Sequence, residues 1–304
     1  MNAPTEALPP IESIRTLLSG IIDYAGLFPP SMVSMQEAVT NFAKYKNGEH
    51  SWMLGRFVVP VARLGEFVES AEGVIGENES PWRLSVLAGE DINVTIREIN
   101  LFNKTNAPRV LCDSLEVKAN TVSKIENTVN ALPSDITAYF EIGVNDNFVD
   151  LVSTLALKHQ RAKVRTGGTT TNEFPPSREI IRFARTCMAA NVPFKATAGL
   201  HHPIRCFRPL TYEPDAPQGT MHGFLNMLMM TGFARESYRV SLLEELMEEE
   251  FDEAFKFREN GAGWRSEHFL TAGHLDRLRT RGMISFGSCS FDEPVADLQG
   301  LGLL

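Results

Sequence analysis

The sequence has few of the features that mark membrane, secreted or nucleic-acid-binding proteins. Its apolar runs all fall short of the roughly 18 residues that a membrane-spanning helix needs. The net charge is −9 and no cluster of Lys and Arg occurs, so neither a membrane nor a nucleic acid is an expected partner. The sequence contains only four cysteines, at Cys112, Cys187, Cys206 and Cys289. They form no CxxC pair, which argues against a zinc knuckle and against a disulfide framework.

The N-terminus lacks a targeting signal as well. The segment from Met1 to Pro10 contains no basic stretch followed by an apolar core, so no signal peptide is expected. We therefore predict a protein of the reducing cytoplasm, with a flexible N-terminal arm at residues 1–12. Small anions remain possible ligands, and self-association into a homo-oligomer stays open.

The 304 residues are 43 % hydrophobic and 22 % charged, which is typical of a globular protein with a large core. Short β-type runs alternate with amphipathic helical stretches, the pattern of parallel strands joined by helices. Eight strands are predicted, at Gly20–Ala25, Trp52–Val59, Arg83–Ala88, Arg109–Val117, Ile136–Ile142, Arg161–Thr166, Pro193–Ala198 and Met283–Gly287. Helices are predicted between them, at Ser34–Tyr45, Ala62–Val74, Asn93–Asn103, Val122–Leu132, Asn147–His159 and Ser177–Ala190. This pattern favours a single α/β domain over residues 1–304, a (β/α)8 TIM barrel.

The spacing of the strands indicates an insertion. The first seven strands start 25 to 32 residues apart, whereas the eighth starts 90 residues after the seventh. We predict a helical insertion at residues 205–282, with a Met-rich helix at 222–234 and an acidic, solvated helix at 241–258. Loops that follow barrel strands lie at the rim where barrels carry their chemistry, so residues 222–258 are expected beside the site as a lid or a subunit interface.

Charged residues recur where the predicted strands end. Lys163 and Arg165 share one face of the sixth strand because side chains alternate along a strand. Lys195 lies on the seventh strand, Glu116 on the fourth and Glu141 at the end of the fifth. Charges inside a barrel are costly unless they are paired or functional. These residues therefore predict an active site, although a single lysine could instead point outward along the helices.

Lysines grouped in this way predict covalent catalysis. A lysine is a nucleophile only when it is neutral, and neighbouring cations lower its pKa toward that state. Lys163, flanked by Arg165 and facing Lys195, would have such surroundings. The expected product is a Schiff base with a carbonyl substrate, followed by proton transfer at the neighbouring carbon.

Two segments resemble the deoxyribose-phosphate aldolase family. Lys163–Gly168 (KVRTGG) is similar to the lysine-x-x-Thr-Gly segment on strand six of that family, and Phe194–Gly199 (FKATAG) is similar to its strand-seven lysine segment. The two lysines are 32 residues apart, close to the family spacing. Four further segments agree in order, at Ile22–Asp23, Phe57–Arg63, Phe140–Gly143 and Phe286–Ser290.

The resemblance implies a class I aldolase-like lyase without a cofactor or a metal. Lys163 would be the Schiff-base lysine, Lys195 would lower its pKa, and Glu116 would replace the family's strand-four aspartate in the proton relay. Asp23 and Glu141 complete the predicted catalytic set. The predicted substrate- and anion-binding residues are Arg165, Thr166, Gly167, Gly168, Gly199, His201, His202, Gly287 and Ser288.

The chain departs from the family pattern at three positions. The carboxylate at position 116 is Glu rather than Asp, Arg165 stands two residues after the lysine, and His201 and His202 follow Gly199. The substrate is therefore left open as a small carbonyl compound, phosphorylated or acidic.

Two alternatives follow from the same residues. His201 or His202 with Glu116 or Glu141 could bind a divalent metal for a metal-dependent lyase or isomerase. Adjacent histidines on a strand point to opposite faces, but Pro203 favours a loop here. The barrel could also be a non-catalytic protein that binds an anion or a sugar. The Asp23–Pro30 segment is either a rigid loop at the mouth of the site or a packed turn, and Cys289 is expected to be an inert buried residue.

Overall fold

A computed structural model describes residues 10–76, 80–144 and 147–304 of the chain. Eight parallel strands close into a barrel in which the last strand pairs with both the first and the seventh. These strands are β1 (Ile22–Tyr24), β2 (Leu54–Pro60), β3 (Trp82–Leu87), β4 (Val110–Lys118), β5 (Thr137–Glu141), β6 (Arg161–Arg165), β7 (Phe194–Thr197) and β13 (Met283–Ser288). The predicted (β/α)8 barrel and all eight of its strands are confirmed.

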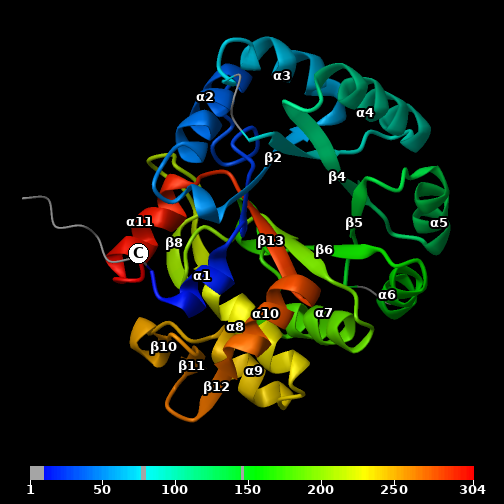
Figure 1. Ribbon diagram of the computed structural model, residues 1–304. Helices are drawn as coiled ribbons and strands as arrows, with labels where there is room; N and C mark the ends of the chain where they lie inside the picture. The colour runs from blue at the N-terminus through cyan, green and yellow to red at the C-terminus, as the bar shows by residue number, and fades with distance from the viewer. Residues whose placement is uncertain (1–9, 77–79, 145–146) are drawn as a thin grey trace, which may run out of the picture.

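Helices surround the strands (Figure 1). The predicted ones are confirmed as α2 (Met35–Lys46), α3 (Leu64–Ala71), α4 (Ile92–Asn106), α5 (Val122–Ala131), α6 (Phe148–Leu157) and α7 (Ser177–Ala189). Side-chain caps fix several of their starts. Asp91, for example, accepts the backbone N–H of Asn93 at 2.8 Å at the start of α4.

The outer faces of the strands carry the apolar core. Phe57 on β2 packs against Phe67 of α3 with ring centroids 5.2 Å apart, and Trp82 on β3 packs against Phe42 of α2 at 4.8 Å. All four rings are buried. Because the apolar side chains face outward to the helices, the alternate positions that point into the barrel are free to carry polar and charged groups.

The N-terminal arm is shorter than predicted. Residues 1–9 lie outside the described part of the chain, but Glu12 already begins helix α1 (Glu12–Leu18). Ile14, Leu17 and Leu18 of α1 are buried, and α1 contacts α10 (Ala272–Arg281). This apolar face, which begins just after the predicted arm, holds α1 against the barrel.

The insertion at residues 205–282 contains strands as well as helices, so the prediction of a helical insertion is only partly right. Its helices are α8 (Phe224–Arg235), α9 (Val240–Met247) and α10. It also contains the hairpin β8 (Cys206–Pro209)–β9 (Gln218–Met221) and an antiparallel sheet of β10 (Phe255–Arg258), β11 (Gly261–Trp264) and β12 (His268–Thr271).

The predicted acidic helix at 241–258 is wrong beyond Met247. The side chain of Asn226 donates to the carbonyls of Leu246 and Glu249 at 2.9 and 2.8 Å, which satisfies the end of α9. Glu249 is buried rather than solvated, since its carboxylate accepts from the indole of Trp264 at 3.3 Å and pairs with Arg265. Contacts between distant residues therefore end this helix.

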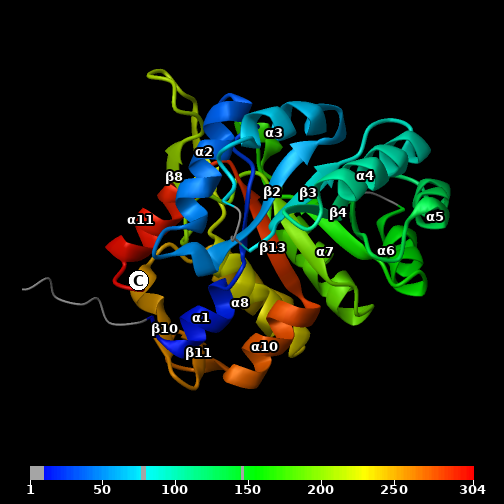
Figure 2. The ribbon, with the colours of Figure 1, turned by 45° about the horizontal axis from the view of Figure 1, so that its top comes forward.

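The predicted lid or interface at residues 222–258 is also wrong. Every residue of α8 from Phe224 to Ala234 is buried, and the helix packs against α7, α9 and α10. The sheet β10–β11 contacts α1, which leads into the N-terminal end of β1, as Figure 2 shows. The insertion reaches the C-terminal rim at the hairpin β8–β9, where β9 contacts the turn Thr171–Glu173 after β6. His222 lies there as well, with its Nε2 atom 2.8 Å from the carbonyl of Pro175.

The final described helix is α11 (Asp292–Gly300), which follows β13. In the described part of the chain, no helix is long and apolar enough to cross a membrane.

Candidate active site

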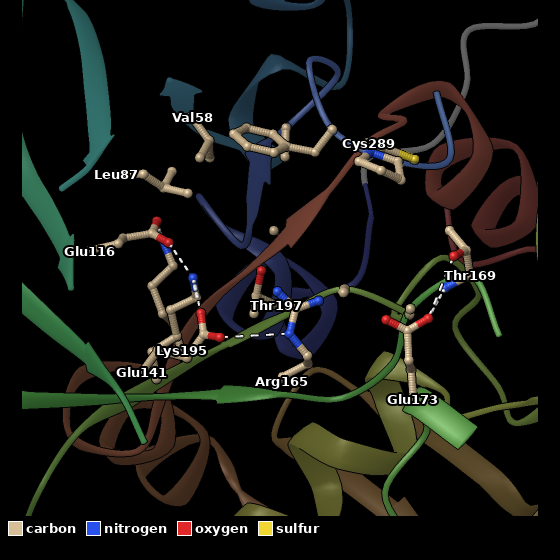
Figure 3. A pocket seen from close by; sticks show the side chains of 18 of the residues that line it. Val58, Leu87, Glu116, Glu141, Arg165, Thr169, Glu173, Lys195, Thr197 and Cys289 are labelled. Carbon is tan, nitrogen blue, oxygen red and sulfur yellow. Dashed lines mark hydrogen bonds and ion pairs between the residues drawn. The ribbon is translucent and has the colours of Figure 1, made fainter. Parts of the chain in front are cut away.

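A cavity of ≈ 320 Å³ is formed where the barrel strands end (Figure 3). The predicted site residues that line it are Glu116, Glu141, Lys163, Arg165, Gly168, Lys195, Gly199, His201 and Gly287. Phe28, Pro29 and Pro30 line it too, so the loop after β1 borders the site, as one of the two interpretations of Asp23–Pro30 expected. Nine of the predicted site residues therefore border one cavity.

Lys195 is held at the bottom of the site between two carboxylates. Its Nζ atom lies 2.7 Å from Asp23 Oδ2 and 2.6 Å from Glu116 Oε1, and its side chain is fully buried. Asp23 does not line the cavity but is fixed beneath Lys195, where it accepts the hydroxyl of Ser285 at 2.8 Å and the backbone N–H of Arg56 at 2.8 Å. Burial alone would lower the pKa of Lys195, but Asp23 and Glu116 outweigh it and raise the pKa. Lys195 is thus a fixed ammonium.

Lys163 sits in a second pair of carboxylates next to the first. Its Nζ atom lies 2.7 Å from Glu116 Oε2 and 2.7 Å from Glu141 Oε2. Glu116 also accepts the hydroxyl of Ser85 at 2.7 Å. Burial alone would raise the pKa of Glu116, but Lys163 and Lys195 lower it strongly. Glu116 therefore separates the two lysines, whereas the sequence reading expected the two cations to face each other directly.

The rim of the cavity carries positive charge. Arg165 projects from the end of β6 with 46 % of its side chain exposed, and its Nε atom is 3.6 Å from Glu141 Oε1. Lys118 at the end of β4 also lines the cavity and is exposed. Burial alone would raise the pKa of Glu141, but Lys163, Arg165 and Lys118 lower it. A negatively charged ligand would meet these cations at the entrance.

Lys163 also borders a second hollow. A cavity of ≈ 500 Å³ on the side of β2 to β4 is lined by Glu116, Lys118, Glu141 and Lys163, all of which also line the first cavity. Lys163 thus borders both cavities.

The predicted anion cradle differs from what the glycines suggested. The backbone N–H groups of Thr169 and Thr170 do converge on one carboxylate oxygen, at 2.8 and 3.0 Å, but that oxygen belongs to Glu173 of the same chain. The Thr170-x-x-Glu173 spacing is a capping-box signal that could have revealed this. A Cβ atom on Gly167 would lie 2.8 Å from the Cα of Gly199. Gly167 is therefore needed for close backbone packing.

Several predicted ligand-binding residues lie outside the lining of the cavity. Thr166 is buried and donates its hydroxyl to the carbonyl of Ala198 at 2.5 Å, which ties the loop after β6 to the loop after β7. Ser288 is buried as well. His202 turns away toward α11, where its Nδ1 atom is 2.6 Å from Asp297 Oδ2. These side chains support the rim and do not face the cavity.

His201 contacts two side chains that the sequence did not predict as its partners. Its Nδ1 atom lies 3.2 Å from Glu293 Oε2 and 3.9 Å from the sulfur of Cys289, which also lines the cavity. The hydroxyl of Tyr212, from the β8–β9 hairpin, is 3.8 Å from the same sulfur. No sequence signal links these positions, because Cys289 and His201 are 88 residues apart.

The metal-ligand set of the alternative prediction is not assembled. Glu116 and Glu141 contact Lys163, while His201 pairs with Glu293 and His202 with Asp297. Among the described residues, no group of three His, Cys, Asp or Glu side chains is arranged to hold a metal ion.

The chain matches no known protein-family model, and no curated protein is similar to it.

Proposed function

We propose that the protein is a class I aldolase-like carbon–carbon lyase in which Lys163 forms a Schiff base with a small carbonyl substrate. One observation carries the proposal: Lys163 lines two cavities, and its Nζ atom lies 2.7 Å from each of two carboxylates, Glu116 and Glu141. A nucleophilic amine needs a neighbouring base that takes its proton, and these carboxylates are within direct reach of it.

The two carboxylates have different roles. Glu116 is fixed by Lys163, Lys195 and Ser85, so it stays ionised and positions Lys163. Glu141 is the less enclosed of the two and accepts the ammonium proton. The neutral amine then attacks the carbonyl carbon, and the Glu141 carboxylic acid gives its proton to the carbonyl oxygen, which becomes the hydroxyl of a carbinolamine. Glu141 then takes a second proton from the nitrogen and passes it to this hydroxyl, which leaves as water and leaves the iminium.

The resulting iminium is an electron sink for the bond next to it. When a carbon–carbon bond breaks there, its electron pair moves toward the iminium nitrogen, and the leaving fragment becomes a second carbonyl compound after its hydroxyl loses a proton. Because Lys163 lines both cavities, a substrate bound to it has space in either one. The cations Arg165 and Lys118 at the rim favour a carboxylate or phosphate on that substrate.

The proposal can be tested without knowing the natural substrate. An iminium acidifies the neighbouring C–H bonds, so the protein should catalyse exchange of these hydrogens for deuterium in small keto acids and aldehydes, followed by NMR. Lys163→Arg should abolish this exchange, because it keeps the charge but removes the usable amine.

A matched control is Lys158→Arg, a half-exposed lysine that pairs with Glu126 at 3.9 Å and lies near the opposite end of β6. This variant should exchange at the wild-type rate. Exchange that survives in Lys163→Arg, or that is absent from the wild type across the panel, would refute the proposal and leave a binding function.

A further inference from the structure

The wall of the cavity around Cys289 contains a second group of reactive side chains. Figure 3 places Cys289 across the cavity from Glu116 and Lys195. The group, here named the thiol cluster, consists of His201, Tyr212, Cys289 and Glu293. Three separate segments supply it: the loop after β7, the turn of the β8–β9 hairpin, and the segment that runs from the end of β13 into the first turn of α11.

The contacts within the thiol cluster place a base and a proton donor beside the sulfur. Glu293 Oε2 is 3.2 Å from His201 Nδ1 and accepts the hydroxyl of Tyr212 at 3.2 Å. The same two polar atoms, His201 Nδ1 and the Tyr212 hydroxyl, lie 3.9 and 3.8 Å from Cys289 Sγ. Glu293 therefore supports a positive charge on the imidazole, and that charge lies next to the sulfur.

The other cysteines provide a contrast. Burial raises the pKa of Cys112, Cys187 and Cys206, the last to about 11. Burial acts on Cys289 in the same direction, but the hydrogen bond and charge of His201 outweigh it and lower the pKa of Cys289. In turn, burial alone would lower the pKa of His201, whereas Cys289 and Glu293 raise it to about 10.

We propose that Cys289 is a second nucleophile of the cavity, an ionised thiolate paired with the imidazolium of His201, and that it binds small electrophilic carbonyl compounds covalently and reversibly. With an aldehyde, a bond forms between Sγ and the carbonyl carbon. The electron pair of the C=O π bond moves to the oxygen, which takes a proton from His201 and gives a neutral thiohemiacetal. The step needs no oxidant, and it does not depend on the chemistry of Lys163.

Alkylation with iodoacetamide at neutral pH, read by peptide mass spectrometry, tests the thiolate. The reagent forms an Sγ–C bond and releases iodide. Cys206 is an internal control because it is more exposed than Cys289. If exposure alone set the rates, Cys206 would be labelled first. The proposal predicts that Cys289 is labelled first.

Two histidine variants separate pairing from folding. His201→Asn removes the charge beside the sulfur, so the rate at Cys289 should fall roughly tenfold or more as the thiolate fraction drops toward a few per cent. His202→Asn, at the neighbouring residue that turns toward Asp297, should leave the rate unchanged. Ultraviolet absorbance of the thiolate, with Cys289→Ser as the blank, measures the ionised fraction of Cys289 without any reagent. It should persist in the wild type below the ordinary thiol pKa of about 8.5 and be lost in His201→Asn.

The covalent step is tested in Lys163→Arg, which excludes protection through a Schiff base. Addition of a small aldehyde should slow alkylation of Cys289 in this variant, and its dilution should restore the rate. Labelling of Cys206 before Cys289, equal rates in wild type and His201→Asn, or no protection by the aldehyde would each overturn the proposal. None of these outcomes affects the deuterium exchange of substrate hydrogens that tests the role of Lys163.

Discussion

Glu116 and Glu249 are both buried carboxylates paired with basic side chains, but their surroundings differ. Glu116 contacts Lys163 and Lys195 and borders two cavities. Glu249 contacts Trp264 and Arg265 and joins α9 to the β10–β12 sheet. Burial of a charge alone therefore does not identify an active site. A buried charge with open space beside it can act on a ligand, whereas one enclosed by packed protein holds the fold together.

The largest expected difference between the two residues is in activity. Glu116→Gln removes the charge that positions Lys163, so we expect deuterium exchange to fall about 10²-fold. Glu249→Gln should leave exchange unchanged, because neither Glu249 nor its partners Trp264 and Arg265 line the cavity. NMR measurement of exchange in both variants checks this, and equal losses would contradict the distinction.

The same two variants should differ in stability. Glu116→Gln leaves two buried ammonium groups with one carboxylate fewer, and breaking such a buried pair costs about 3–5 kcal/mol. The partner of Glu249, Arg265, has 49 % of its side chain exposed, so water can solvate it when Glu249→Gln removes the charge. We expect a loss of about 1–3 kcal/mol for that variant. Chemical denaturation measures both, and a larger loss at Glu249 would reverse the ranking.

The pH dependence of stability should reflect both signs of charge in the site. The pKa of Glu116 is lowered by folding. Its contribution to the free energy of unfolding is therefore fully present above the unfolded pKa of about 4.3 and is lost as the pH falls below that value. The pKa of Lys195 is raised, so its contribution is fully present below about 10.4 and is lost as the pH rises above it.

Between pH values of about 4.3 and 10.4, these two groups should therefore not change the melting temperature. The melting temperature should fall at lower and at higher pH. The acid fall should be shallower in Glu116→Gln than in the wild type. An acid limb of unchanged slope in the variant would show that Glu116 is not the group responsible.

Smaller effects are expected from the serines that orient the carboxylates. Ser285→Ala removes a hydrogen bond to Asp23, and Ser85→Ala removes one to Glu116. Each should cost about 1.5–3 kcal/mol, the range for a hydrogen bond to a charged group. Ser13 is a matched control, since its buried hydroxyl has no partner among the described residues. Ser13→Ala should be neutral or stabilising in the same denaturation assay, and a loss as large as that of Ser285→Ala would argue against this view of the serines.

The smallest effect concerns the nest formed by the backbone N–H groups of Thr169 and Thr170, which Glu173 occupies. Glu173→Ala frees the N–H groups of Thr169 and Thr170, so inorganic phosphate should raise the melting temperature of this variant by more than that of the wild type. An identical phosphate response in both proteins would show that the nest is not an anion site.

The fold was predictable because its signals are local and periodic. Most barrel strands are short apolar runs followed by a helix, and alternation along β6 correctly placed Lys163 on the inward face of the barrel. The end of α9 was not predictable, since Asn226 and Trp264 act on it from elsewhere in the chain. The hairpin and sheet of the insertion likewise escaped a prediction based on helical periodicity.

The site was predictable only as a set of residue types at strand ends. Alternation placed Lys163, Lys195 and Glu116 on the inward face, but it could not show that Glu116 would lie between the two amines. The pairing of Cys289 with His201 depends on how two loops 88 residues apart are folded. Partners across a barrel depend on register and loop geometry, and a single sequence carries no direct signal for them.

The most direct test of the account is reductive trapping at Lys163. Wild-type protein incubated with small aldehydes and keto acids, then reduced with borohydride, should carry a stable adduct on the peptide that contains Lys163, detected by mass spectrometry. Lys163→Arg should carry none there, and Lys158→Arg should carry the same adduct as the wild type. An adduct on exposed lysines alone, or equal trapping in Lys163→Arg, would contradict the Schiff-base chemistry proposed for this barrel.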